Sequence, residues 1–198
     1  MVKKLQALRA KKGFTLVELI VVIAIIGVLA AILIPTLASQ ITKSKVTSAD
    51  STAKELLQTV NSWAADWVSA GGAELESQDI LIKMDKGSAS VSGSDGGSRF
   101  DGCAGFTAGR PGCPESLEDR FASDYSARTF TAMVFVDNSG YAVFSWFVPD
   151  NANFSGSTPD FDNFKSTTFS WKDKKKEGVN AQGIIVGTYP KLSHPDNT

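Results

Sequence analysis

The longest apolar stretch of the chain lies near its N-terminus. Sixteen consecutive residues from Leu19 to Ile34 carry neither a charge nor a strongly polar group, and with its flanks the apolar segment covers residues 14–40. A helix of about 20 apolar residues is long enough to cross a bilayer. The segment is interrupted by Glu18, an acid that is costly inside a membrane unless something pairs with it. The pattern therefore predicts a membrane-spanning helix with a functional carboxylate near its start.

A second helical pattern follows over residues 41–70. Its apolar residues recur at spacings of three and four, at Val46, Ala49, Ala53, Leu56, Val60, Trp63 and Trp67. An apolar stripe on a polar helix packs on a sheet or on another helix, and three heptads are also compatible with a coiled coil. We expect one long helix from Phe14 to Ala70 that stops at Gly71-Gly72. Pro35 lacks an amide hydrogen and either kinks or locally melts this helix or ends the membrane span.

Short apolar runs in residues 71–198 predict strands. The clearest is a hairpin, with strands at 129–136 and 141–148 joined by a turn at 137–140. Further strands are expected at 80–82, 167–171 and 183–189, with a charged turn at 172–178, a Gly/Ser-rich loop at 85–114 and a helical turn within 114–125. The expected fold is α+β, a long N-terminal α-helix whose C-terminal half packs on an antiparallel sheet of about four strands.

The charge distribution orients the apolar segment. Five basic residues and no acid precede residue 14, namely Lys3, Lys4, Arg9, Lys11 and Lys12. Basic residues beside a membrane span stay on the cytoplasmic side. The rest of the chain has fifteen basic residues against 21 acidic ones, which argues against a nucleic-acid-binding body. From the residues alone, a permanent anchor and a secretory signal cut within residues 35–39 are both open.

Gly13-Phe14-Thr15-Leu16-Val17-Glu18, the apolar run and Pro35 together resemble the leader and first helix of type IV pilins and of the related pseudopilins. The resemblance covers about residues 1–40. It implies that residues 1–13 are a leader, that a prepilin peptidase cuts between Gly13 and Phe14, and that the new amine of Phe14 is N-methylated. It also implies residues 41–70 as the amphipathic half of the helix, and residues 71–198 as a globular pilin head.

Four residues of the apolar segment are expected to act in assembly. We expect Glu18 to pair with the charged amine of Phe14 on a neighbouring copy, since the pair offsets two desolvation costs. The alternative is that Glu18 only lies at the membrane interface. Gly27 weakens the helix, and Pro35 bends it, which relieves crowding among packed helices.

The two cysteines, Cys103 and Cys113, are separated by nine residues rich in Gly and Pro. Outside the cytoplasm we expect them to form a disulfide, worth about 2–3 kcal/mol for such a small loop. The alternative is two free thiols, and a metal site is not supported because no second Cys or His pair accompanies them. Many type IV pilins close a loop nearer the C-terminus, so this position departs from the family pattern.

The chain has few residues or motifs that are typical of catalytic sites. Its single histidine, His194, lies in a Pro-flanked tail, and the sequence contains no phosphate-binding loop, nucleophile elbow or metal-ligand cluster. We expect no enzyme, no cofactor and no metal. Lys174-Lys175-Lys176 is either a soluble turn or a contact for DNA or an anionic surface.

The resemblance favours a structural pilus subunit as the function. It implies a precursor that spans the cytoplasmic membrane once and is then stacked into an extracellular filament, used for adhesion, motility or DNA uptake. The implied partners are further copies of the chain, the prepilin peptidase, an assembly platform and its ATPase. The alternatives are a pseudopilin of a type II secretion or competence system, and a membrane-anchored adhesion module that does not polymerise.

Overall fold

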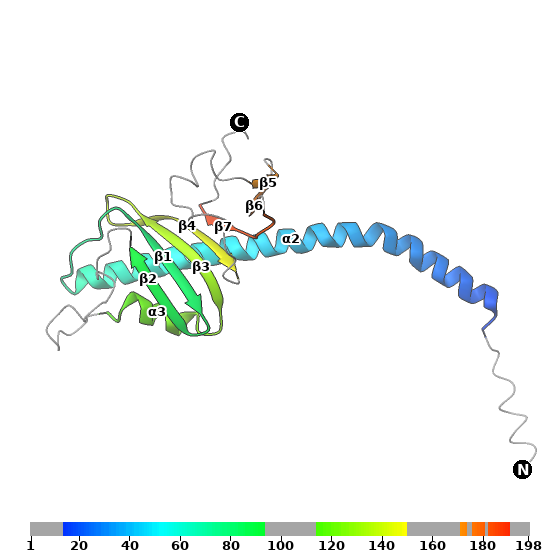
Figure 1. Ribbon diagram of the computed structural model, residues 1–198, viewed down its shortest axis with the longest axis horizontal. Coiled ribbons are helices and arrows are strands. Elements are labelled where there is room, and N and C mark those ends of the chain that lie inside the picture. The colour runs from blue at the N-terminus through cyan, green and yellow to red at the C-terminus, as the bar shows by residue number, and fades with distance from the viewer. Residues whose placement is uncertain (1–13, 94–113, 150–170, 174–175, 181, 191–198) are drawn as a thin grey trace, which may run out of the picture. The chain divides into compact units, whose positions relative to one another are not determined.

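The computed structural model describes residues 14–93, 114–149, 171–173, 176–180 and 182–190. The chain divides into two compact units, Met1–Lys43 and Ser44–Thr198. One helix, α2 (Leu16–Ser69), contributes to both units and contains Pro35 in its interior (Figure 1). The prediction of a single long helix that continues beyond Pro35 is confirmed. The kink at Pro35 stays a prediction.

The C-terminus of α2 is closed by the two glycines that follow it. Gly71 adopts a φ of 87°, in the left-handed region that favours glycine. The amide of Gly71 donates to the carbonyl of Val68, and that of Gly72 to the carbonyl of Trp67, both at 2.9 Å. This pair of bonds is a Schellman motif, which satisfies carbonyls that the end of the helix leaves unpaired. The predicted stop signal is confirmed.

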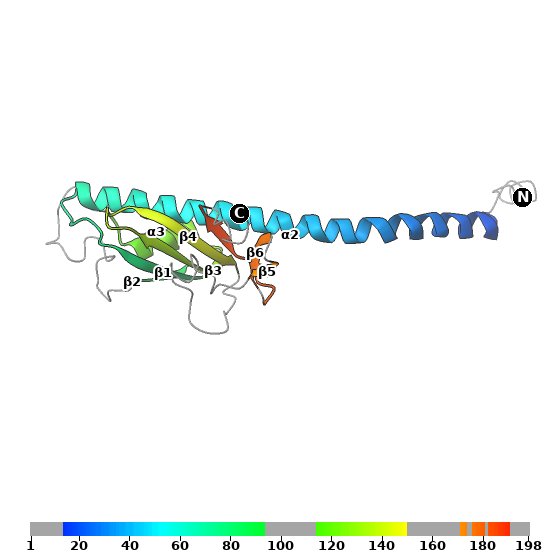
Figure 2. The same cartoon turned by 90° about the horizontal axis from the view of Figure 1, so that it is seen from above.

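The main sheet has five antiparallel strands in the order β2-β1-β3-β4-β7. Their bounds are β1 (Gln78–Asp85), β2 (Ser88–Gly93), β3 (Thr129–Val136), β4 (Ala142–Pro149) and β7 (Gly187–Tyr189). A short helix, α3 (Leu117–Asp124), precedes β3, and β5 (Trp171–Asp173) pairs with β6 (Lys176–Asn180) in a separate hairpin. Figure 2 shows the sheet lying along the C-terminal half of α2. The α+β class and the hairpin of β3 and β4 are confirmed.

Three segments of the head differ from the expected strands and loops. Residues 88–93, expected in a loop, form β2, because Lys86 and Gly87 both have positive φ (44° and 92°) and make the two-residue turn that suits a hairpin. Residues 176–178, expected in a charged turn, belong to β6 (Lys176–Asn180). Of the strand expected at 183–189 only Gly187–Tyr189 pairs with β4. The strand expected at 167–171 falls outside the described residues except for Trp171.

Two clusters of buried side chains occupy the two faces of the sheet. The predicted stripe of α2 is buried against β1, β3 and α3, with Leu56, Val60 and Trp63 fully enclosed. A smaller cluster gathers Met133, Phe144, Trp146, Val148 and Val186. In β4, Phe144, Trp146 and Val148 alternate with Ser145 and Phe147, so the smaller cluster lies on the face turned away from α2.

Close contacts bind β4 and β7 directly to α2. The hydroxyl of Ser145 donates to the carbonyl of Ala53 at 2.6 Å, and the amide of Thr188 donates to Oδ1 of Asp50 at 3.0 Å. At Gly187 an added Cβ would lie 2.1 Å from the carbonyl carbon of Ala49. The strand therefore touches the helix backbone where only glycine fits.

Candidate functional site

The N-terminal part of α2 is apolar on all sides and exposed on all sides. Every large hydrophobic residue from Phe14 to Ile41 is at least 46% exposed. This part of α2 is long and apolar enough to cross a membrane, and none of its most apolar stretch is buried within the chain. A helix that is hydrophobic all round needs an apolar environment, either a bilayer or other protein. The candidate functional site is therefore this segment, residues 14–41.

The segment begins with a reciprocal cap formed by Thr15 and Glu18. The backbone amide and the hydroxyl of Thr15 both donate to Oε2 of Glu18, each at 2.8 Å, and the amide of Glu18 donates back to Oγ1 of Thr15 at 3.2 Å. This is a capping box, in which the side chain at the third helical position closes the helix start. A carboxylate there also faces the positive end of the helix dipole.

The cap explains how the acid is held inside an apolar segment. Its hydrogen bonds compensate part of the cost of taking a carboxylate out of water. Phe14 lies directly before the cap, outside the helix and with its side chain exposed. Gly13 lies outside the described residues. The structure thus brings Glu18 next to Thr15. This pair was not predicted from the sequence, although the spacing Thr-x-x-Glu is typical of a capping box.

Gly27 and Pro35 both lie in the exposed part of α2. A Cβ added at Gly27 would have no neighbour within 4 Å. Pro35 cannot donate a hydrogen bond to the preceding turn. The hydroxyl of Thr36 donates to the carbonyl of Leu33 at 2.8 Å, so this polar group is satisfied inside the helix. The expected roles of Gly27 and Pro35 in assembly stay predictions.

Other predicted sites lie outside the residues that the structure describes. The residues concerned are Cys103, Cys113, Lys174 and Lys175. The disulfide and the basic tip therefore stay predictions. Among the described ranges, no group of three His, Cys, Asp or Glu side chains comes together in a way that could hold a metal ion.

Comparisons with known proteins match part of the chain. A family model described as the prokaryotic N-terminal methylation motif matches residues 8–34. The chain is 58% identical to fimbrial protein Q of Moraxella bovis over 40 residues, and this match covers 20% of this chain and 26% of that protein. The type IV major alpha-pilin of Moraxella bovis matches at the same identity over 40 residues, 25% of its length.

A longer match joins the chain to the type IV major fimbrial protein FimA of Dichelobacter nodosus. The two are 41% identical over 61 residues, 31% of this chain and 39% of that protein. The chain thus spans between a quarter and two fifths of the length of these relatives. No solved structure matches it.

Proposed function

We propose that this chain, which carries the N-terminal methylation motif and the sequence similarity of the type IV pilins, is a structural subunit of a type IV pilus. The precursor spans the cytoplasmic membrane, a prepilin peptidase cuts it between Gly13 and Phe14, and the amine of Phe14 is methylated. The mature chain is then stacked by an assembly platform and its ATPase into an extracellular filament. Residues 14–40 supply the membrane anchor and later the filament core.

The observation that carries the proposal is the exposed apolar surface of residues 14–41. A continuous apolar surface of this size is not stable in water. Lipid satisfies it in the precursor, and the same side chains on neighbouring copies satisfy it in a filament. Gly27 fits this second environment, because its missing side chain leaves room for a neighbouring helix.

The capping box links processing to assembly. Before cleavage the nitrogen of Phe14 is a neutral amide, and after cleavage it is a charged amine. The donors in the cap belong to Thr15, downstream of the cut, so cleavage leaves Glu18 held at the helix start. The carboxylate then meets the amine of Phe14 on a neighbouring copy, and the pair fixes the axial register of the incoming subunit.

Mass spectrometry of the mature N-terminus tests the processing step. We expect N-methyl-Phe14 as the first residue. An intact Met1, or a chain that begins after Ala38, would contradict the proposal, since the first is an unprocessed anchor and the second a cleaved secretory signal.

Two substitutions at Glu18 separate its charge from its capping role. Glu18→Ala removes both and is expected to leave the chain in the membrane without filaments. Glu18→Gln keeps an oxygen that can accept from Thr15, since Gln also serves in a capping box, but it has no charge. If the ion pair sets the register, both variants abolish filaments. Filaments from Glu18→Gln show that capping alone suffices and refute the pairing.

Electron microscopy of sheared surface material distinguishes the alternatives. A pilus subunit is expected in long surface filaments. A pseudopilin shows the same mature N-terminus without long surface filaments, and a non-polymerising adhesion module shows neither.

A further inference from the structure

The head carries a groove on each side of the exposed ridge of α2. The first, here called the Tyr141 flank, has a volume of about 340 Å³, and its lining residues include Asn61, Val68, Glu74 and Tyr141. The second, the Glu55 flank, has a volume of about 480 Å³ and lies between α2 and α3. It is lined by Glu55, Gln58, Thr59, Ser62, Arg120, Asp124 and Tyr125.

The Tyr141 flank gathers exposed apolar side chains. Outside the N-terminal segment, the described residues include four exposed large hydrophobics, and two of them, Val68 (40% exposed) and Tyr141 (64%), line this groove. One more, Tyr189, lies beneath the ammonium group of Lys54, 5.5 Å from its ring centre. Lys54 precedes Asn61 by two helical turns, so it continues the same stripe of α2. Exposed tyrosines beside apolar surface are typical of protein contacts.

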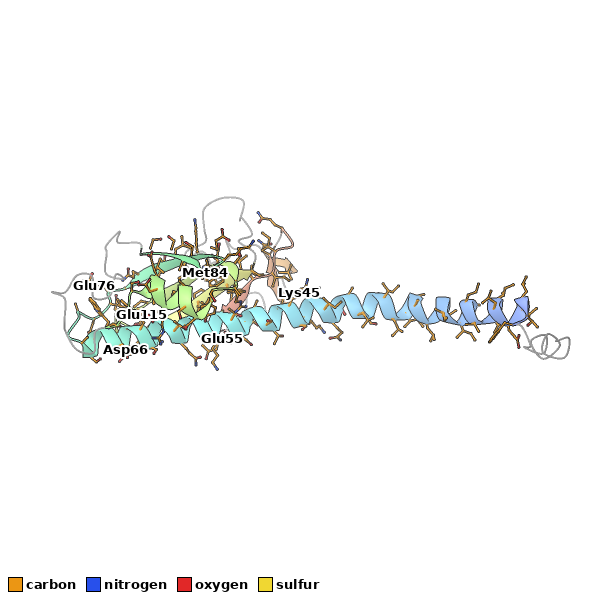
Figure 3. All side chains as sticks on the ribbon, turned by 90° about the horizontal axis from the view of Figure 1, so that it is seen from below. Lys45, Glu55, Asp66, Glu76, Met84 and Glu115 are labelled. Atoms are coloured by element: carbon orange, nitrogen blue, oxygen red, sulfur yellow. The ribbon has the colours of Figure 1, made fainter. Side chains whose placement is uncertain are left out.

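The Glu55 flank is polar and predominantly acidic. Arg120 lies 3.6 Å from both Glu115 and Asp124, so its charge is already matched within the chain. Glu55 adds a further carboxylate on the α2 side of the groove. Figure 3 labels Glu55 and Glu115, which lie at α2 and just before α3.

The two flanks are chemically complementary. The phenol of Tyr141 offers a hydroxyl donor, and Lys54, two helical turns before Asn61 on the same stripe of α2, offers a positive charge. Glu55 and Asp124 on the other flank offer carboxylate acceptors. The guanidinium of Arg120 suits the ring face of a tyrosine. Lys54 and the phenol of Tyr141 therefore match the carboxylates of the Glu55 flank, although Glu74 also lines the Tyr141 flank.

The geometry favours a contact between different surfaces of successive copies. Lys54 and Asn61 on one flank are followed directly in sequence by Glu55 and Ser62 on the other. At 3.6 residues per turn, the two stripes lie about 100° apart around α2. Two unlike patches on separate sides of a molecule generate a heterologous contact, which propagates from copy to copy instead of closing into a dimer.

The Tyr141 flank is also preorganised. The side chain of Asn61 donates to the carbonyl of Ala142 at 3.1 Å and accepts from its amide at 2.7 Å. This pair of bonds fixes the residue next to Tyr141 to the helix, which lowers the ordering cost of binding.

We propose that the Tyr141 flank of one copy docks against the Glu55 flank of the next copy, as the lateral contact between heads. The inference rests on the proposed function insofar as the contact repeats along a filament.

A photo-crosslinker placed in the full-length chain in whole cells tests the contact. Tyr141 is replaced by a benzophenone amino acid, which preserves an aromatic ring, and the covalent dimer is mapped by mass spectrometry. We expect the crosslinked peptides of the second copy to come from residues 55–62 or 118–125. The reciprocal probe at Gln58, which lines the Glu55 flank, is expected to reach residues 65–69 or 139–143 of another copy. The same probe at Lys83, on the exposed side of β1, is the matched control and is expected to reach neither flank.

The outcomes separate this inference from the function. A dimer that joins the Tyr141 flank to itself, or no dimer at all, overturns the contact, whether or not wild-type cells bear filaments. The expected crosslink in cells without filaments supports the contact and refutes the pilus. Filaments without that crosslink support the pilus and refute the contact.

Discussion

Asn61 offers the sharpest test of how the head is held on α2. Strand β7 pairs with β4 only at Ser145, Trp146 and Phe147, so the first residue of β4, Ala142, has no partner strand on that side among the described residues. The carboxamide of Asn61 takes the place of a strand there, with one donated and one accepted hydrogen bond to the backbone of Ala142. We expect Asn61→Ala to destabilise the head.

The size of the effect follows from those two bonds. Each is worth about 1 kcal/mol net, and a backbone group left unpaired in a buried place costs about 1–3 kcal/mol. Ala142 is 5% exposed, so water replaces the lost partners poorly. We therefore expect a loss of about 2–3 kcal/mol, which lowers the Tm of a head of this size by about 4–12 °C.

Near-ultraviolet circular dichroism of the full-length chain in detergent measures this loss, because buried Trp63 and Trp146 report on packing of the head. Asn61→Asp has nearly the same size but replaces the donor with a carboxylate oxygen opposite the carbonyl of Ala142. It is expected to lose as much as Asn61→Ala at neutral pH. Gln58→Ala, one turn away and exposed, is the control and is expected within about 0.5 kcal/mol of the original chain. Both Asn61 variants within that range would refute the reasoning.

Three further predictions concern the packing of the head, and urea unfolding checks each. Gly187→Ala is expected to cost about 1–3 kcal/mol, because its Cβ has no room against the backbone of Ala49; an unchanged midpoint would contradict the close contact. Trp63→Ala is expected to cost about 3–5 kcal/mol, since it empties a fully buried site and leaves the carbonyl of Glu115 without the indole donor at 2.8 Å; a loss below 1 kcal/mol would speak against this core. Burial raises the pKa of Tyr125 above its ordinary value of 10.0, and the hydrogen bond from Thr59 only partly opposes this. The unfolded chain then releases the phenolic proton first, so stability is expected to fall as pH rises from about 10, and a Tyr125→Phe chain with the same pH dependence would disprove that origin.

The sequence predicts those parts of the fold that are set by local pattern. The stripe of α2 was readable because one face is buried along its length, as at Leu56 and Val60. The stop at Gly71 was readable because only glycine readily takes the required φ. The capping box is equally local, since Thr15 and Glu18 are three residues apart, although it was not among the predicted features.

The remaining parts depend on contacts between distant residues. Strand β2 alternates serines with Ala89, Val91 and Gly93, of which only Val91 has a strong strand preference, and it is a strand because Ser88 to Gly93 pair along β1. Strand β7 lies within the strand expected at 183–189, but its close approach to α2 at Gly187 and Ala49 has no signal in the local sequence. The role of Asn61 depends on where β7 ends, so it becomes visible only in the folded chain.

The cap at Thr15 also determines where α2 begins. Helix α2 begins at Leu16, and Phe14 and Thr15 precede it in non-helical backbone. A protease binds its substrate in an extended form, and a bond inside a helix has its carbonyl and amide already engaged. By closing α2 at Leu16, two residues beyond the proposed cut, Thr15 and Glu18 keep Phe14 outside the helix, where a peptidase can bind it in an extended form. The residues proposed to align the subunits would thus also make the precursor a substrate.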